Sequence, residues 1–119
     1  MNKAIIENVT QEAEFKTSYL YVDVSYESDL NKAIALMKEV VLAHPLFLDT
    51  TTSMQEEKVP VHCMEFKDSG ISLRAKVTTK TTLDGFTLLS DCRIQVKDAF
   101  DQNGIEIPYP HLQVINKAN

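Results

Sequence analysis

The feature that most constrains the fold is the order in which two hydrophobic periodicities follow each other. Alternating apolar residues predict half-buried strands, and apolar residues spaced by three or four predict helices packed along one face. The sequence changes from one period to the other four times and ends on a short alternating segment. The expected order is strand, helix, strand, strand, helix, strand, at residues 17–26, 30–44, 59–66, 71–79, 82–103 and 105–107.

This order predicts an α+β fold of the ferredoxin-like βαββαβ type. In that arrangement a four-stranded antiparallel sheet carries both helices on one face. The C-terminal residues add an extra strand after the last element. We expect three regions: residues 1–15 from a preceding small β domain, residues 16–108 as the ferredoxin-like domain, and residues 109–119 as an oligomerisation strand or tail.

The first strand and helix have the clearest signals. Leu20, Val22 and Val24 alternate with polar or tyrosine residues, so they are expected to face the core. Ser28 or Asp29 is the expected N-cap of the following helix, which Pro45 ends. The predicted apolar stripe of this helix consists of Leu30, Ala33, Ile34, Met37, Val40 and Val41.

The second half of the chain repeats the pattern. A hairpin is expected at residues 67–70, where Asp, Ser and Gly supply turn chemistry. The strand at 59–66 has apolar residues on both faces, so its buried side stays open. The strand at 71–79 is predicted to bury Ile71, Leu73, Ala75 and Val77, and the second helix to bury Phe86, Leu89, Val96, Ala99 and Phe100.

The segment "GIEIPYPH" at residues 104–111 stops the regular pattern. Gly104 suits the left-handed residue that ends a helix. Pro108 and Pro110 cannot donate to a sheet, so pairing within the domain is expected to end there. The alternation resumes after them, and it predicts a strand that pairs with another chain.

Composition and spacing argue against several kinds of chemistry. The net charge of −5 disfavours a general nucleic-acid or anionic-membrane binder. His62 and Cys63 are neighbours on a strand and point to opposite faces, and neither Cys92 nor His111 has a ligand spacing. No glycine-rich phosphate loop or activated nucleophile is present. We therefore expect no enzyme, metal, cofactor or small-molecule substrate, and two reduced thiols.

The face of the sheet without helices is expected to carry Tyr19, Tyr21, Arg74 and Lys76. Aromatic and cationic side chains on an open sheet are typical of RNA-recognition domains. The Gly–aromatic–Gly run of those domains is missing from residues 71–79, which disfavours RNA as a partner. Two interpretations stay open: side chains half-covered by their neighbours, and a contact between subunits.

Three runs of sequence, in this order, resemble the C-terminal cytoplasmic region of small-conductance mechanosensitive channels (MscS-like). They are "VSYESDLNKAIALMKEVVLAHP", "DSGISLRAKV" and "VKDAFDQNGIEIPYPH". The family's Val-x-Tyr motif followed by Ser/Thr-Asp-Leu matches residues 24–30. Its Ala-Phe-Asp and Gly-Ile-Glu-Ile-Pro-aromatic-Pro ending matches residues 99–101 and 104–110.

This resemblance implies a non-catalytic vestibule domain of a homoheptameric channel that releases ions and small solutes on osmotic downshock. The domain would lie on the cytoplasmic side of the inner membrane, with the transmembrane helices upstream. No stretch of this chain reaches the length of about 20 apolar residues that a spanning helix needs, so we expect a soluble fragment or a stand-alone relative. The alternative is a stand-alone ferredoxin-like domain that binds a small regulatory ligand.

In this interpretation, the last strand of each subunit joins a barrel around the symmetry axis. The expected interface residues are Tyr109, Leu112, Val114 and Ile115. Gly104, Pro108 and Pro110 would set the path of the chain into that barrel.

Overall fold

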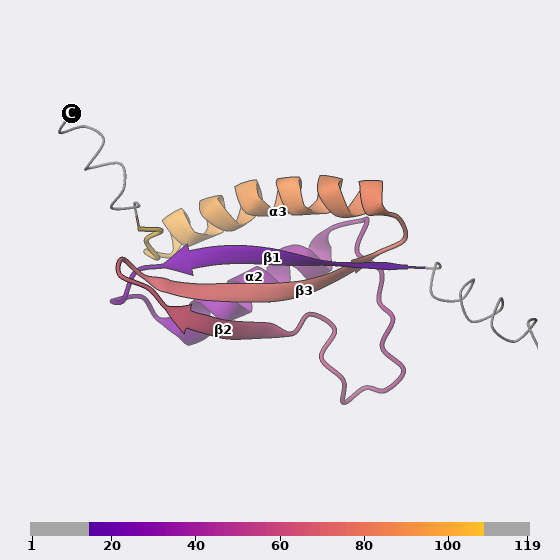
Figure 1. Ribbon diagram of the computed structural model, residues 1–119, viewed down its shortest axis with the longest axis horizontal. Coiled ribbons are helices and arrows are strands. Elements are labelled where there is room, and N and C mark those ends of the chain that lie inside the picture. Colours follow the sequence, from indigo (N-terminus) through magenta and orange to yellow (C-terminus); the bar gives the residue numbers. More distant parts are fainter. Residues whose placement is uncertain (1–14, 109–119) are drawn as a thin grey trace, which may run out of the picture.

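The computed structural model describes residues 15–108 and has two helices beside an antiparallel sheet (Figure 1). The sheet has three strands in the order β1-β3-β2. Inward side chains from the sheet and from both helices form one hydrophobic cluster, so the helices cover the same face. The α+β class is therefore confirmed. The elements are β1 (Lys16–Val24), α2 (Leu30–Ala43), β2 (Val61–Phe66), β3 (Ile71–Thr79) and α3 (Thr82–Gln102).

The strand β1 follows the predicted alternation. Leu20, Val22 and Val24 are buried, and Tyr19 and Tyr21 lie exposed on the other face. β1 pairs with β3 over its full length, from Lys16 opposite Thr79 to Val24 opposite Ile71. The period of two thus places every second side chain from Leu20 to Val24 in the core.

Side-chain caps define where both helices begin. The Asp29 carboxylate accepts a hydrogen bond from the Lys32 backbone N–H at 3.2 Å, and the Thr81 hydroxyl accepts one from the Asp84 N–H at 3.0 Å. Each cap satisfies a backbone donor that the first helical turn leaves unpaired. Of the two N-caps considered for α2, Asp29 is the one that forms, and α2 ends at Ala43, two residues before Pro45.

The buried stripe of α3 differs from the predicted one. Phe86, expected in the core, is 68% exposed, whereas Val96 and Phe100 are buried as predicted. The phase of the helix is set by Gly85, where an added Cβ would lie 2.9 Å from Ser18 Oγ of β1. With Gly85 turned toward the strand, Phe86 is turned about 100° away from it. The observed buried residues are Gly85, Leu88, Cys92, Val96 and Phe100.

The fourth strand expected at residues 105–107 does not form among the described residues. Ile105 is buried and Ile107 is 37% exposed, and this segment belongs to no sheet. Next to β1 it accepts one backbone hydrogen bond, donated to the Glu106 oxygen at 2.9 Å by the N–H of Ser25, the residue that follows the strand. Gly104, with φ of +73°, turns the chain against the end of β1 instead of along its edge.

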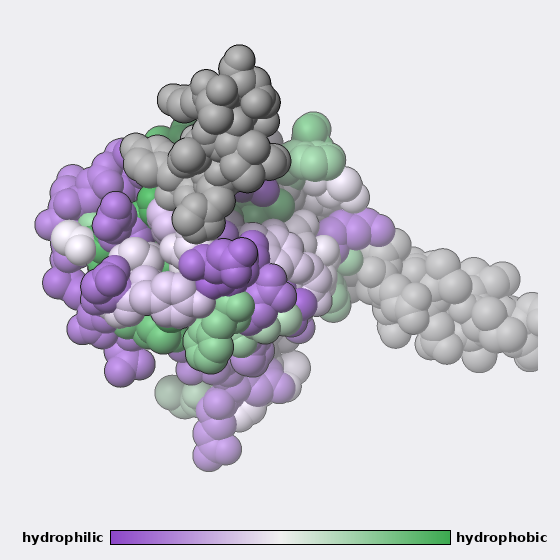
Figure 2. Space-filling view, turned by 60° about the vertical axis from the view of Figure 1, so that its left-hand side comes forward, coloured by the Kyte–Doolittle hydropathy of each residue, from purple (hydrophilic) through white to green (hydrophobic). Residues whose placement is uncertain are grey.

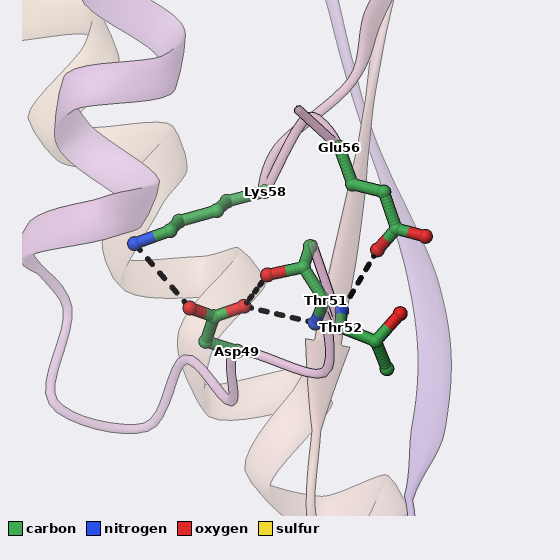
Figure 3. A network of polar contacts seen from close by, with 5 residues as sticks. All are labelled: Asp49, Thr51, Thr52, Glu56 and Lys58. Atoms are coloured by element: carbon green, nitrogen blue, oxygen red, sulfur yellow. Dashed lines mark hydrogen bonds and ion pairs between the residues drawn. The ribbon is translucent and has the colours of Figure 1, made fainter. Parts of the chain in front are cut away.

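The segment between α2 and β2 is held by polar contacts (Figure 3). The Asp49 carboxylate accepts hydrogen bonds from the Thr51 hydroxyl and backbone N–H, at 2.6 and 3.0 Å, and lies 3.3 Å from Lys58 Nζ. These contacts, led by the Thr51 hydroxyl, lower the pKa of Asp49. Glu56 accepts from the Thr52 N–H at 2.9 Å. The network closes a long connection without regular secondary structure.

A buried histidine connects the two helices. His44, which is 8% exposed, accepts at Nδ1 from the Leu46 N–H at 3.1 Å, and its Nε2 lies 2.8 Å from Asp91 Oδ2. Since Nδ1 is an acceptor, the proton is on Nε2 and is donated to Asp91. No local pattern predicts this pair, because its members are 47 residues apart.

Replacing Asp91 by Ala is expected to lower the free energy of unfolding by about 1–3 kcal/mol, because it leaves a buried imidazole N–H unpaired. Urea unfolding followed by circular dichroism measures the change. Asp98→Ala removes an exposed carboxylate from the same helix and serves as the control. Equal loss in both variants would contradict a specific role for the His44–Asp91 pair.

Candidate assembly surface

The segment after α3 crosses the end of the sheet and contacts the β2–β3 turn. Ile105 N–H donates to the Phe100 oxygen at 2.9 Å, which closes the helix end around Gly104. A Cβ built on Gly70 would lie 2.7 Å from Pro108 Cγ and 2.6 Å from the Val24 oxygen. Pro108 is therefore packed where only a glycine leaves room. The predicted structural roles of Gly104 and Pro108 stay predictions, but both residues lie at this crossing.

The other predicted assembly residues lie outside residues 15–108. They are Tyr109, Pro110, Leu112, Val114 and Ile115.

A groove of about 460 Å³ lies beside this crossing, between the flank of α3 and the edge of β1 that pairs with no strand of the described residues. Val22, Val96, Ile107 and Pro108 supply its apolar lining. Its polar lining is mostly cationic and consists of Tyr21, Asp23, Lys67, Arg93 and Lys97. Two of these cations have acidic neighbours, with Lys67 Nζ 3.3 Å from Asp23 Oδ2 and Lys97 Nζ 2.9 Å from Asp101 Oδ2.

Sequence reasoning did not find this groove. Arg93 and Val96 are three residues apart on α3, which places them near each other on the helix. That spacing was visible in the sequence, but the strand edge that faces it was expected to be covered by a fourth strand. The missing strand is what leaves the groove open among the described residues.

The open face of the sheet brings two of its four predicted residues into contact. Arg74 Cζ lies 4.4 Å from the centre of the Tyr19 ring, a cation–π geometry. The register places Tyr21 opposite Arg74 and Tyr19 opposite Lys76. Tyr21 and Lys76 are exposed, whereas Arg74 covers part of the Tyr19 ring. This face therefore carries two tyrosines beside two cations. What it contacts stays a prediction.

The described residues offer little for catalysis or metal binding. Within residues 15–108 no three His, Cys, Asp or Glu side chains group as a metal site. Burial, with a smaller contribution from the Asp91 charge, raises the pKa of the Cys92 thiol to about 11. Cys63 is exposed on β2. A protonated buried thiol is a poor nucleophile.

In the same range no helix is both long and apolar enough to cross a membrane.

Comparison with solved structures identifies the fold. The solved structure of Helicobacter pylori MscS in its closed state matches with a TM-score of 0.63 and 23% sequence identity. The match covers 81% of this chain and 36% of that chain, so this chain spans only part of the length of the channel it resembles. At this identity the likeness establishes the α+β fold alone.

Comparison with models of protein families identifies the family. Residues 20–107 match the model described as "Mechanosensitive ion channel MscS, C-terminal". The chain therefore belongs to the family of MscS C-terminal domains, as the motifs at residues 24–30 and 99–110 predicted. No curated protein matches the chain with significance.

Gly70→Ala is expected to lower the free energy of unfolding by about 1–3 kcal/mol, because its methyl group would overlap the Val24 oxygen and Pro108. Urea unfolding measures this change, and Ser69→Ala in the same turn is the matched control. A Gly70→Ala protein as stable as the control would show that the contact with Pro108 is loose.

The two thiols are expected to react separately. At pH 8 the folded protein should release one equivalent of thionitrobenzoate from Ellman's reagent, because Cys63 is exposed while Cys92 is buried with its pKa raised to about 11. Denaturant should release the second equivalent. The control, Cys63→Ser, should not react while folded; rapid reaction of that variant would contradict the burial of Cys92.

Proposed function

We propose that this chain is the cytoplasmic vestibule domain of a mechanosensitive channel that releases ions and small solutes on osmotic downshock. The observation that carries the proposal is the family match over residues 20–107. The fold of the described residues, shared with Helicobacter pylori MscS, supports it. In this proposal the domain acts by assembling with other copies around an axis, has no enzymatic activity, and belongs to a channel anchored in the inner membrane by helices upstream.

The assembly we propose is a homoheptamer whose subunits are joined by residues 109–119. Tyr109, Leu112, Val114 and Ile115 would form the contacts of that strand, with Gly104, Pro108 and Pro110 setting its path. Residues 16–108 would be the ferredoxin-like unit, and residues 1–15 the end of a preceding β domain. The order β1-β3-β2 agrees with three of the four strands of a ferredoxin-like sheet, and the place next to β1 is the one a fourth strand would take.

The experiment is a chimaeric channel. Residues 16–119 replace the corresponding domain of Helicobacter pylori MscS, and the chimaera is expressed in bacteria that lack their own mechanosensitive channels. We expect the chimaera to restore survival of osmotic downshock and to give tension-gated currents in membrane patches.

The control is the same chimaera without residues 109–119. It should give a folded domain, since the core lies within residues 20–105, but it should assemble poorly and protect few cells. A chimaera that is inserted and assembled but gives no current would overturn the proposed function. Equal protection with and without residues 109–119 would overturn the role of the terminal strand.

A further inference from the structure

We propose that the groove between β1 and α3 receives Phe66 of a second copy of this chain, so that copies join head to tail. The groove is the one lined by Val22, Val96, Ile107 and Pro108, with Arg93 and Lys97 on its rim. This inference rests on the proposed function, because it names the contact between copies in the assembly. It uses a surface within residues 15–108 and is independent of the terminal strand.

Phe66 is the most exposed large hydrophobic side chain on the described sheet. It is 72% exposed at the end of β2, and its register opposite Ile71 places it on the face that carries the helices. Its ring lies 6.5 Å from that of Tyr26, whose hydroxyl donates to the Lys67 carbonyl oxygen. Phe66 is thus supported on one side and open to solvent on the other, as an interface anchor would be.

The position of Phe66 relative to the groove fits a head-to-tail contact. β1 and β2 are the two outer strands of the sheet, so Phe66 lies on the edge away from β1, while Lys67, the next residue, reaches the groove from the β2–β3 turn. Across the sheet Val24 pairs with Ile71 and Ile71 with Phe66, so Phe66 lies at the level of the β1 end that borders the groove. Copies related by rotation about an axis along the strands would bring these two places together. Such heterologous contacts are the kind that close into rings.

Charge favours the same occupant. Phe66 lies between Glu65 and Lys67, and Asp68 follows in the turn. Lys67 Nζ lies 3.3 Å from Asp23 Oδ2, so the charges beside Phe66 without an ion pair in the range 15–108 are those of Glu65 and Asp68. On the rim of the groove, Arg93 forms no hydrogen bond or ion pair with any residue in the range 15–108. An acidic edge that carries an aromatic side chain complements an apolar groove with a cationic rim.

The contact is expected to use side chains more than a continuous backbone ladder. The register of β2 against β3 shifts between Cys63 and Glu65, and such a bulge disfavours the addition of another strand along an edge. The end of the molecule that Figure 2 turns toward the viewer shows hydrophobic surface in separate patches among hydrophilic residues. A single aromatic anchor within a charged rim fits this surface.

Cysteine cross-linking of the full chain tests the proposal. In a Cys63→Ser background, Phe66→Cys and Ile107→Cys place one thiol at each end of the proposed contact. Under mild oxidation the double variant should give a ladder of dimers, trimers and higher species. A mixture of the two single variants should stop at dimers, because each contact uses a different site on each copy.

The matched control exchanges the anchor for a residue of similar exposure elsewhere. Phe86→Cys with Ile107→Cys pairs the groove with an exposed aromatic of α3, and it should cross-link about tenfold less, as expected without a held contact. In the Cys63→Ser background without added thiols, Phe66→Ser should weaken self-association in analytical ultracentrifugation about tenfold, and Phe86→Ser should leave it unchanged.

Three results would overturn the inference. One is equal cross-linking by the proposed and control pairs. A second is dimers alone from the double variant, formed through Phe66→Cys on both copies, which would indicate a two-fold contact. The third is slow alkylation of the single Ile107→Cys variant at concentrations where the chain is monomeric, which would indicate that its own terminal segment or a small molecule fills the groove. None of these results would overturn the proposed function, because a ring can form through another surface. The chimaeric channel tests that function separately.

Discussion

The central strand β3 is the constraint on which the rest of the structure depends. It pairs with β1 on one side and β2 on the other, and its inward residues Ile71, Leu73, Ala75 and Val77 are all buried. These side chains meet residues of both helices in a single cluster. Because one strand serves both neighbours, β1 and β2 become the edges of the sheet among the described residues. Edges have unpaired backbone groups, and proteins cover or protect them. The two edges here differ: β1 borders a groove, and β2 carries a bulge and exposed side chains.

Much of this arrangement could be predicted from the sequence because it depends on local periodicity. The alternation of Leu20, Val22 and Val24 fixed the buried face of β1, and the same pattern fixed that of β3. Both helices followed from apolar spacing, and the preference of short polar residues for helix starts predicted an α2 cap at Ser28 or Asp29, of which Asp29 forms. The motifs at residues 24–30 and 99–110 led to the family that the match over residues 20–107 establishes. These signals all lie within single elements or their immediate ends.

The features that were missed depend on contacts between distant residues. The stripe of α3 was misassigned at Phe86 because its phase is fixed by Gly85 approaching Ser18, and no periodicity within α3 records the position of β1. The His44–Asp91 hydrogen bond joins two helices across 47 residues. The groove was missed because it is open only if residues 105–107 do not extend the sheet. That outcome depends on how Gly104 turns the chain toward Ser25. Local pattern therefore predicted the elements and one buried face, and packing decided the surfaces.

Two glycines hold β1 at both ends, and this affects where the chain leaves the domain. Gly85 lies against Ser18 at one end, and Gly70 lies against Val24 and Pro108 at the other. A proline alone stops sheet pairing but does not choose a direction, because it restricts only its own φ and the residue before it. Here the direction comes from the β2–β3 turn, since the missing side chain at Gly70 is what admits Pro108. The exit of the chain is thereby placed beside the groove and at the level of Phe66 on the sheet. A change in the position of this turn would move the direction in which the chain leaves Pro108 together with the proposed contact surface, which couples the two proposed means of assembly through one small piece of the fold.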